Sequence, residues 1–112
     1  MLELRRDDRE AFVGGRRAAL TLREFEVLEA LSSRPDRVVG REAIYESVWG
    51  GQMPRRDRAV DVHVRRIRSK LQAIAPEWAF IHTHFGIGYR LFPEPLPGAT
   101  VSGSGHDPRQ TA

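Results

Sequence analysis

A regular stripe of apolar residues marks residues 55–72 as an amphipathic helix. Its members recur at steps of four, three, four and three residues: Val60, Val64, Ile67, Leu71 and Ile74. At about 100° per residue these positions share one narrow face, which is typical of a helix that packs against a core. The opposite face carries Arg58, Val62, Arg65, Arg66 and Ser69. The pattern therefore predicts a helix with an apolar inner face and a basic outer face.

Two further helices are expected between residues 21 and 49. The first opens with Thr21 and Glu24, which fit a capping box in which a hydroxyl and a carboxylate satisfy free backbone N–H groups. Its apolar side follows at four positions, Leu22, Phe25, Leu28 and Leu31. A short extended piece at 38–39 separates it from a second helix over 41–49, which two glycines stop. The inward side of this second helix is expected to hold Ile44 and Val48.

Alternation of apolar and polar residues predicts β-strands at both ends of the chain. Before the helices, short strands are expected within residues 1–20, paired across a turn at Gly14 and Gly15. After the helices, a closing hairpin is expected over 78–92, and the three prolines that follow are expected to end regular structure. Together these elements predict an α+β fold with an N-terminal antiparallel sheet, three helices and a C-terminal β-hairpin.

Length and composition indicate one soluble globular domain. Residues 1–96 are expected to form it, and residues 97–112, rich in Gly, Ser, Thr and Pro, a disordered C-terminal tail. The chain has no cysteine, which excludes a disulfide framework and a thiolate metal site. No apolar run approaches the length of a membrane span, and the first residues do not form a signal peptide. A cytoplasmic protein without membrane contact is therefore expected.

The positive charge of the chain is concentrated in the predicted third helix. Residues 55–70 carry a net charge of +5, whereas the whole chain carries +3 and the remainder therefore −2. A basic stripe on one helix is typical of nucleic-acid-binding proteins, and arginine pairs bidentately with guanine in the major groove. A solvated charged helix usually pairs its cations with carboxylates four residues away, and only Asp61 with Arg65 offers such a pair here. The pattern favours DNA binding.

Five short motifs occur in order along the chain. They are L-T-x-x-E-F-x-x-L at 20–28, R-E-x-I at 41–44, V-W-G at 48–50, R-x-V-D-V-H-V-R-R-I-R-x-K-L at 58–71, and G-x-G-Y-R at 86–90. Over residues 2–92 the chain closely resembles the C-terminal effector domain of OmpR/PhoB-type response regulators. The resemblance implies a winged helix-turn-helix with a four-stranded N-terminal sheet, three helices and a hairpin wing. It also implies sequence-specific binding of double-stranded DNA by a bacterial transcriptional regulator.

The same resemblance implies how DNA would be bound. The third helix would enter the major groove and the wing would lie on the backbone or in the minor groove. Arg66 is the candidate for a base contact, and Ala59 and Val62 lie where the family meets bases, often through thymine methyl groups. Backbone contacts are implied for eight residues of the third helix, the second helix and the wing: Arg58, His63, Arg65, Arg68, Arg41, Trp49, Thr83 and Tyr89.

The resemblance also implies partners. A protein that is a monomer without DNA would bind direct-repeat half-sites, and the loop 51–56 matches a segment that touches RNA polymerase in some members. No cofactor is expected. The family usually carries a receiver domain with a phosphorylatable aspartate, for which 112 residues leave no room. The chain would then be an excised effector domain, a piece of a different fusion or a stand-alone regulator, and control by phosphorylation is not implied.

The predicted wing tip departs from the family pattern. Many members carry an arginine two residues after the wing threonine, where this chain has Phe85. An exposed phenyl ring gains nothing from facing water. Phe85 is therefore expected either to fold back onto Ile81 or Ile87, or to lie against a deoxyribose at the edge of the groove.

Three other functions are less favoured by the sequence. His82, His84 and His63 could in principle ligate zinc, but a zinc site normally needs four ligands and no cysteine is available. An enzyme is not indicated, because no catalytic set or phosphate-binding loop is present, and Asp61 is expected instead to orient Arg65 or Arg68. The main alternative is a winged-helix protein-interaction module without sequence-specific DNA binding. Such a module would need aromatic or aliphatic anchors on the outer face of the third helix, which is basic here.

Overall fold

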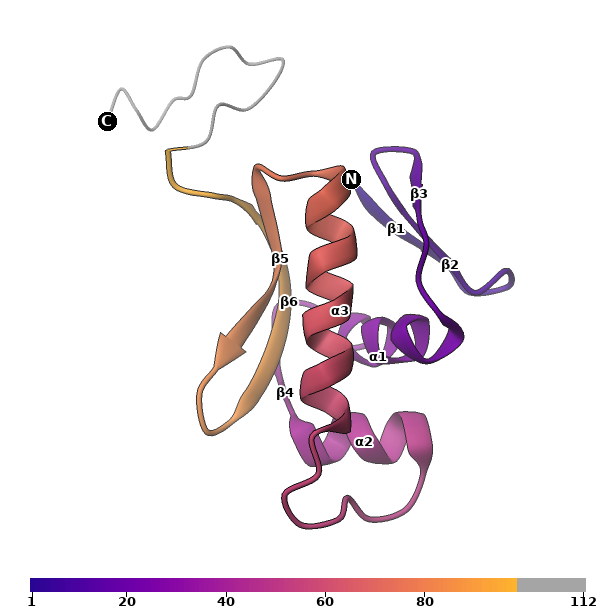
Figure 1. The fold of residues 1–112 in the computed structure, drawn as a ribbon, viewed down its shortest axis with the longest axis vertical. Helices are drawn as coiled ribbons and strands as arrows, with labels where there is room; N and C mark the ends of the chain where they lie inside the picture. Colours follow the sequence, from indigo (N-terminus) through magenta and orange to yellow (C-terminus); the bar gives the residue numbers. More distant parts are fainter. Residues whose placement is uncertain (99–112) are drawn as a thin grey trace.

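The computed structural model describes residues 1–98, which form three helices and two small antiparallel sheets (Figure 1). The first sheet contains β1 (Leu2–Arg5), β2 (Glu10–Val13) and β3 (Arg16–Ala18). The helices are α1 (Leu22–Ser32), α2 (Arg41–Trp49) and α3 (Ala59–Ile74). The second sheet contains β4 (Val38–Gly40), β5 (Trp78–His84) and β6 (Gly88–Pro95). Most of the tail predicted over 97–112 lies outside the described residues.

The N-terminal sheet has three strands in the order β1-β2-β3. The predicted hairpin turn is confirmed at Gly14 and Gly15, whose φ angles of 56° and 82° lie in the region that glycine adopts readily. The four-stranded sheet implied by the resemblance is wrong for the described residues. Only three paired segments precede α1, and the next strand, β4, pairs with β6 because α1 carries the chain away from the first sheet (Figure 1).

β4 attaches the hairpin to the second helix. The two hydrogen-bonded strands bring Gly40 opposite Gly88, and α2 begins at the next residue, Arg41. The backbones approach so closely that a Cβ atom on Gly88 would lie 2.0 Å from the carbonyl oxygen of Val39. A glycine is therefore required at the root of the hairpin, since no side chain fits there.

The apolar stripe predicted for the third helix is confirmed. Its inner face is fully buried at Val60, Val64, Ile67 and Leu71. α3 packs through this face against the other two helices and against strands of both sheets. None of the three helices in the described region is long and apolar enough to cross a membrane.

The inward face of α1 differs in part from the prediction. Phe25, Leu28 and Leu31 are buried as expected, but Leu22 is 56% exposed, so its assignment to the core is wrong. At about 100° per residue the buried arc passes through Val27, Leu28 and Leu31, and Leu22 falls well outside it.

The capping box at the start of α1 is confirmed and extends into the core. Thr21 and Glu24 exchange hydrogen bonds of 2.9 and 3.2 Å between side chain and backbone. Glu24 is only 2% exposed, and its carboxylate lies 2.7 Å from Lys70 Nζ on α3. Burial by itself raises the pKa of Glu24, but the hydrogen bonds from Lys70 and Thr21 outweigh it and the net shift is downward. The ion pair therefore ties α1 to α3, a contact that the sequence did not indicate.

The third helix begins four residues later than predicted, at Ala59 instead of residue 55. The backbone before it is not helical, because Arg56 adopts a φ of 59°. Asp57 then accepts a hydrogen bond of 2.7 Å from the N–H of Ala59. A short acidic side chain that satisfies a free N–H group at a helix start competes with continuation of the helix in the N-terminal direction. Arg58 therefore stands at the helix N-cap, and Arg55 lies in the preceding loop.

The closing hairpin runs further than predicted. The prolines after residue 92 were expected to end regular structure, yet β6 continues to Pro95, which pairs with Trp78. The register changes between Ala79–Glu94 and Ile81–Leu91, which leaves two residues of β6 opposite one of β5. Such a bulge accepts Pro93 because a bulged residue need not donate a ladder hydrogen bond.

Candidate nucleic-acid interface

The outer face of α3 is basic, and two of its arginines have no anionic partner among residues 1–98. Arg65 and Arg66 are both exposed, and neither forms an ion pair within residues 1–98. Val62 lies between them on the same face and is half-buried. Arg58 stands at the start of the helix with its side chain 73% exposed, although its Nε lies 3.5 Å from Asp61. These residues form the basic face predicted from the sequence.

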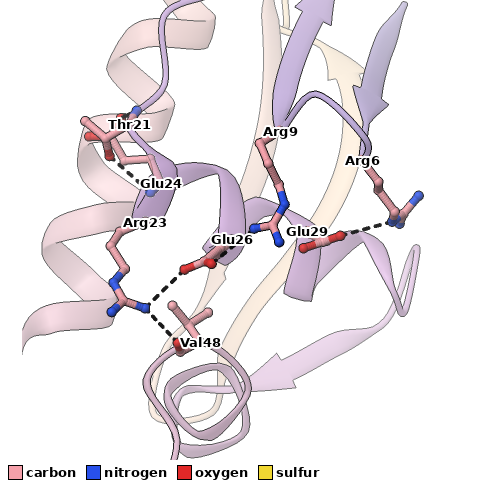
Figure 2. A network of polar contacts seen from close by, with 8 residues as sticks. All are labelled: Arg6, Arg9, Thr21, Arg23, Glu24, Glu26, Glu29 and Val48. Atoms are coloured by element: carbon pink, nitrogen blue, oxygen red, sulfur yellow. Dashed lines mark hydrogen bonds and ion pairs between the residues drawn. The ribbon is translucent and has the colours of Figure 1, made fainter.

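Arginines on the far side of the helical layer are instead paired with glutamates (Figure 2). Arg6 and Arg9, from the turn between β1 and β2, contact Glu29 and Glu26 of α1, both at 3.2 Å. Arg23 contacts Glu26 at 3.1 Å and donates a hydrogen bond of 2.9 Å to the carbonyl of Val48 at the end of α2 (Figure 2). The network links the first sheet, α1 and α2, and its cations are already neutralised.

An aromatic cluster connects α2 with α3. Trp49 stacks on Tyr45 with ring centroids 5.1 Å apart and meets the ring of His63 edge-on at 5.1 Å. His63 Nδ1 lies 2.7 Å from the carbonyl oxygen of Ala59, which holds the ring in place. Trp49, His63 and Ala59 are all half-buried at the border of the basic face. The Trp49 ring thus packs between the two helices while part of it stays accessible, and its implied backbone contact stays a prediction.

Arg68 connects α3 to the hairpin. Its Nε donates to the carbonyl of Ile81 at 3.0 Å and its Nη2 to the hydroxyl of Thr83 at 2.5 Å. Burial lowers the pKa of Arg68 from its usual value. The guanidinium thus holds the hairpin against the helix, and its predicted phosphate contact stays a prediction. Thr83 accepts this bond, so its own hydroxyl hydrogen is still available to donate.

Asp61 is the centre of a second polar cluster. Tyr89 of β6 donates a hydrogen bond to its carboxylate, and Arg41 and Arg58 lie 3.6 and 3.5 Å away. The expectation that Asp61 would pair with Arg65 or Arg68 is wrong, because its side chain points from the flank of α3 toward β6 and α2. The spacing of Arg58 and Asp61 by three residues was the available signal for one of these contacts, whereas Arg41 and Tyr89 reach Asp61 from distant elements and could not be predicted.

Burial raises the pKa of the Tyr89 hydroxyl to about 12, and the hydrogen bond to Asp61 adds to the shift. Tyr89 therefore stays protonated at neutral pH and keeps its donor role toward Asp61. A phosphate therefore cannot accept a hydrogen bond from Tyr89 while Asp61 does, because the phenolic oxygen has only one hydrogen to donate.

The hairpin tip is apolar and exposed. Phe85 is 91% exposed and Ile87 63%. Of the two placements expected for Phe85, folding back onto its own hairpin is therefore wrong, and contact with a deoxyribose stays a prediction. A tight turn closed by Gly86, with a φ of 77°, projects the ring away from both strands. Behind the tip, His82 Nε2 lies 2.7 Å from the carbonyl oxygen of Phe92.

Three helices, the third of them basic, followed by a β-hairpin define the winged helix-turn-helix class. β5 and β6 form its wing, which lies along the left of α3 in Figure 1. The comparisons with known proteins agree with this class. Residues 15–91 match the family described as transcriptional regulatory protein, C terminal, and the chain belongs to this family of OmpR/PhoB-type effector domains.

The chain is similar to parts of longer regulators. It is 44% identical over 73 residues to the transcriptional regulatory protein CreB of Escherichia coli strain K12, which covers 65% of this chain and 32% of CreB. It is 43% identical over 83 residues to the response regulator MprA of Mycobacterium ulcerans, which covers 74% of this chain and 35% of MprA. The chain thus spans about a third of the length of these curated relatives.

A solved structure with the same fold contains DNA. The DNA-binding domain of Klebsiella pneumoniae RstA, in complex with the RstA box, superposes with a TM-score of 0.71. The two sequences are 30% identical, and the match covers 80% of this chain and 89% of that one.

Proposed function

We propose that the chain binds double-stranded DNA sequence-specifically as the effector domain of a bacterial transcriptional regulator. α3 would lie in the major groove, and the wing on the backbone or in the minor groove. The observation that carries this proposal is the pair of exposed, unpartnered arginines on the outer face of α3, Arg65 and Arg66. Arginines without carboxylate partners are free to pair with phosphates or with guanine.

We propose a contact with a base or with the DNA backbone for each residue predicted from the sequence. Arg66 is proposed to contact a base edge, with Ala59 and Val62 beside it for apolar contact with bases. The proposed backbone contacts surround these positions on α3, at both ends of α2 and on the wing: Arg58, His63, Arg65, Arg68, Arg41, Trp49, Thr83 and Tyr89. DNA binding by family members, such as the RstA domain with its box, supports the assignment.

Selection of bound sequences from a random duplex pool tests the function. A short motif, repeated in the same orientation about one helical turn apart, is the expected result. A gel shift then compares the selected duplex with a scrambled one at fixed salt. Binding that does not distinguish the two would contradict sequence-specific recognition, and no binding at all would contradict the DNA function.

We also propose that the domain is a monomer without DNA. Apart from Phe85 and Ile87 at the wing tip, the large apolar side chains exposed on the described surface, such as Met1 and Leu22, lie on different elements. A stable dimer needs a larger contiguous apolar interface. Light scattering of the free domain is the check, and a tight dimer would contradict the proposal. The loop over residues 51–56 remains a candidate contact for RNA polymerase.

A protein-interaction module is the second candidate function, favoured only by the exposed apolar wing tip at Phe85 and Ile87. A docking face on α3 would need apolar anchors, and its exposed residues include Arg65 and Arg66 instead. The related proteins are transcription regulators, which supports a non-enzymatic role.

A further inference from the structure

One carboxylate joins the third helix, the second helix and the wing. Asp61 lies on the flank of α3, where it accepts a hydrogen bond from Tyr89 and lies within 3.6 Å of Arg41 and 3.5 Å of Arg58. Its side chain is largely shielded from solvent, with 16% exposed. Three of the residues proposed to contact the DNA backbone therefore share a single anionic partner.

This carboxylate opposes binding of DNA in its electrostatic effect. A negative charge beside the phosphates repels them, and its ion pairs withdraw positive charge from the surface. By charge alone, Asp61 lowers the affinity of this surface for DNA. Any favourable contribution of Asp61 to binding therefore has to come from the positions in which it holds its neighbours.

The geometry of Arg41 is consistent with a positioning role for Asp61. Arg41 Nε is buried and has no hydrogen-bond partner among residues 1–98, and its distance of 3.6 Å from Asp61 is too long for a hydrogen bond. The Asp61 carboxylate thus attracts the Arg41 guanidinium by its charge but does not accept a hydrogen bond from Nε. Tyr89, in contrast, is fixed directly, because its hydroxyl donates to Asp61.

We propose that Asp61 is a positioning residue that lowers affinity for DNA of any sequence and raises discrimination between sequences. By holding Arg41, Arg58 and Tyr89 together, it sets the spacing at which α2, α3 and the wing meet the backbone. Only a duplex that presents its bases to Arg66 at that spacing is bound well. The inference rests on the proposed DNA-binding function.

The test compares Asp61→Asn with the wild type on the selected duplex and on a scrambled duplex, at two salt concentrations. The asparagine can still accept the bond from Tyr89 but cannot pair with the arginines. Binding to the scrambled duplex should tighten about two- to fivefold, the factor that corresponds to ion pairs of this exposure. The salt slope should steepen by about one contact, and the ratio of selected to scrambled affinity should fall.

Tyr89→Phe separates geometry from charge. It keeps the Asp61 carboxylate but removes the hydrogen bond that fixes the wing. The affinity ratio should therefore fall, while binding to the scrambled duplex should not tighten. Thermal unfolding of each variant establishes that the protein is folded at the temperature of the assay.

Glu42→Gln is the matched control. Glu42 is exposed on α2 next to Arg41 and forms no ion pair within residues 1–98, so its loss removes the same charge without touching the cluster. It should tighten binding to both duplexes equally. If Asp61→Asn changes the ratio no more than Glu42→Gln does, the positioning role is overturned. A wild type that does not distinguish the two duplexes would instead overturn the proposed function itself.

Discussion

Arginines serve two different purposes on the two sides of the helical layer. Beside the first sheet, Arg6, Arg9 and Arg23 lie against glutamates of α1 and join three elements (Figure 2). On the outer face of α3, Arg65 and Arg66 have no such partners within residues 1–98. The residue type is the same on both sides, so the difference lies in the carboxylates around it.

This comparison shows why net charge alone is a weak guide to a binding surface. Exposed ion pairs contribute little to stability, typically about 0.2–1 kcal/mol each, but they cancel the local potential. Unpaired arginines contribute nothing to folding and leave the potential intact. Substitutions on the paired side should therefore change the free energy of unfolding, and substitutions on the unpaired side should change DNA affinity.

The largest effect on stability is expected at the buried pair of Glu24 and Lys70. Lys70→Ala leaves the Glu24 carboxylate, 2% exposed, without its cation. The free energy of unfolding should fall by about 2–3 kcal/mol, because an unpaired buried charge is costly. Urea denaturation measures the change, and Lys70→Arg is the control that retains the charge. A loss equal to that of an exposed pair would show that Glu24 is well solvated.

The cost of Lys70→Ala should also depend on pH. In the wild type the pKa of Glu24 is lowered below its usual value of 4.5, so its contribution to stability is present above that pH and is lost on acidification. In Lys70→Ala the lowering of the pKa by Lys70 is lost while burial still raises it, and protonation relieves the unpaired charge. The difference in unfolding free energy between the two proteins should therefore shrink below about pH 4.5.

On the unpaired side, the largest expected effect belongs to Arg66. Arg66→Ala should lower the free-energy difference between selected and scrambled duplexes by about 1–3 kcal/mol, because it removes a base-edge contact. Stability should change by less than about 0.5 kcal/mol, since the side chain is exposed and unpaired. Titration of both duplexes measures this difference. An unchanged ratio of selected to scrambled affinity would contradict the proposed base contact of Arg66.

A matched pair of substitutions tests the comparison directly. Arg65→Ala and Arg9→Ala remove the same charge from opposite sides of the helical layer. Arg65→Ala should weaken binding to all sequences alike and reduce the salt slope by about one, with Arg58→Ala behaving similarly. Arg9→Ala should leave the slope unchanged and lower stability by about 0.2–1 kcal/mol, because it breaks the pair with Glu26. Equal salt slopes for the two variants would contradict the division of roles.

The smallest effect is expected at the wing tip. Phe85 is exposed but uncharged, whereas an arginine there can enter a narrow A·T-rich minor groove. Phe85→Arg should therefore tighten binding, steepen the salt slope by about one contact and raise preference for A·T-rich flanks. Duplexes that differ only in their flanks, titrated at two salt concentrations, measure this. Identical slopes would mean that the tip does not reach DNA, and would also weaken the proposed contacts of Thr83 and Tyr89.

Local patterns in the sequence predicted the elements well. The stripe from Val60 to Leu71, the capping box at Thr21 and the turn at Gly14 each depend on neighbouring residues, and each is confirmed. The start of α3 was placed too early because a run of arginines is compatible with a helix. Asp57 was the available signal, since an acidic residue just before an apolar period favours a helix start there.

Contacts between distant elements could not be predicted. β4 pairs with the wing strand β6 because of the direction in which the chain leaves α1. The hydrogen bond of Tyr89 with Asp61 likewise depends on how distant elements pack. The sequence also could not show that Arg68 is bound to the wing at Ile81 and Thr83. The sequence therefore predicted which residues form the basic face. It did not predict that Arg68 is bound to the wing while Arg65 and Arg66 have no partner among residues 1–98.

The close approach of Gly88 to Val39 has a consequence for redesign of the wing. The apolar tip residues, Phe85 and Ile87, face solvent and can be exchanged without disturbing the strands. At Gly88, by contrast, a single methyl group would collide with the backbone of β4, 2.0 Å away, and push against the residue that precedes α2. Substitutions at Phe85 and Ile87 should therefore be tolerated, whereas substitutions at Gly88 should not. New groove-binding side chains can be introduced at the tip if glycine is kept at Gly86, which closes the turn, and at Gly88.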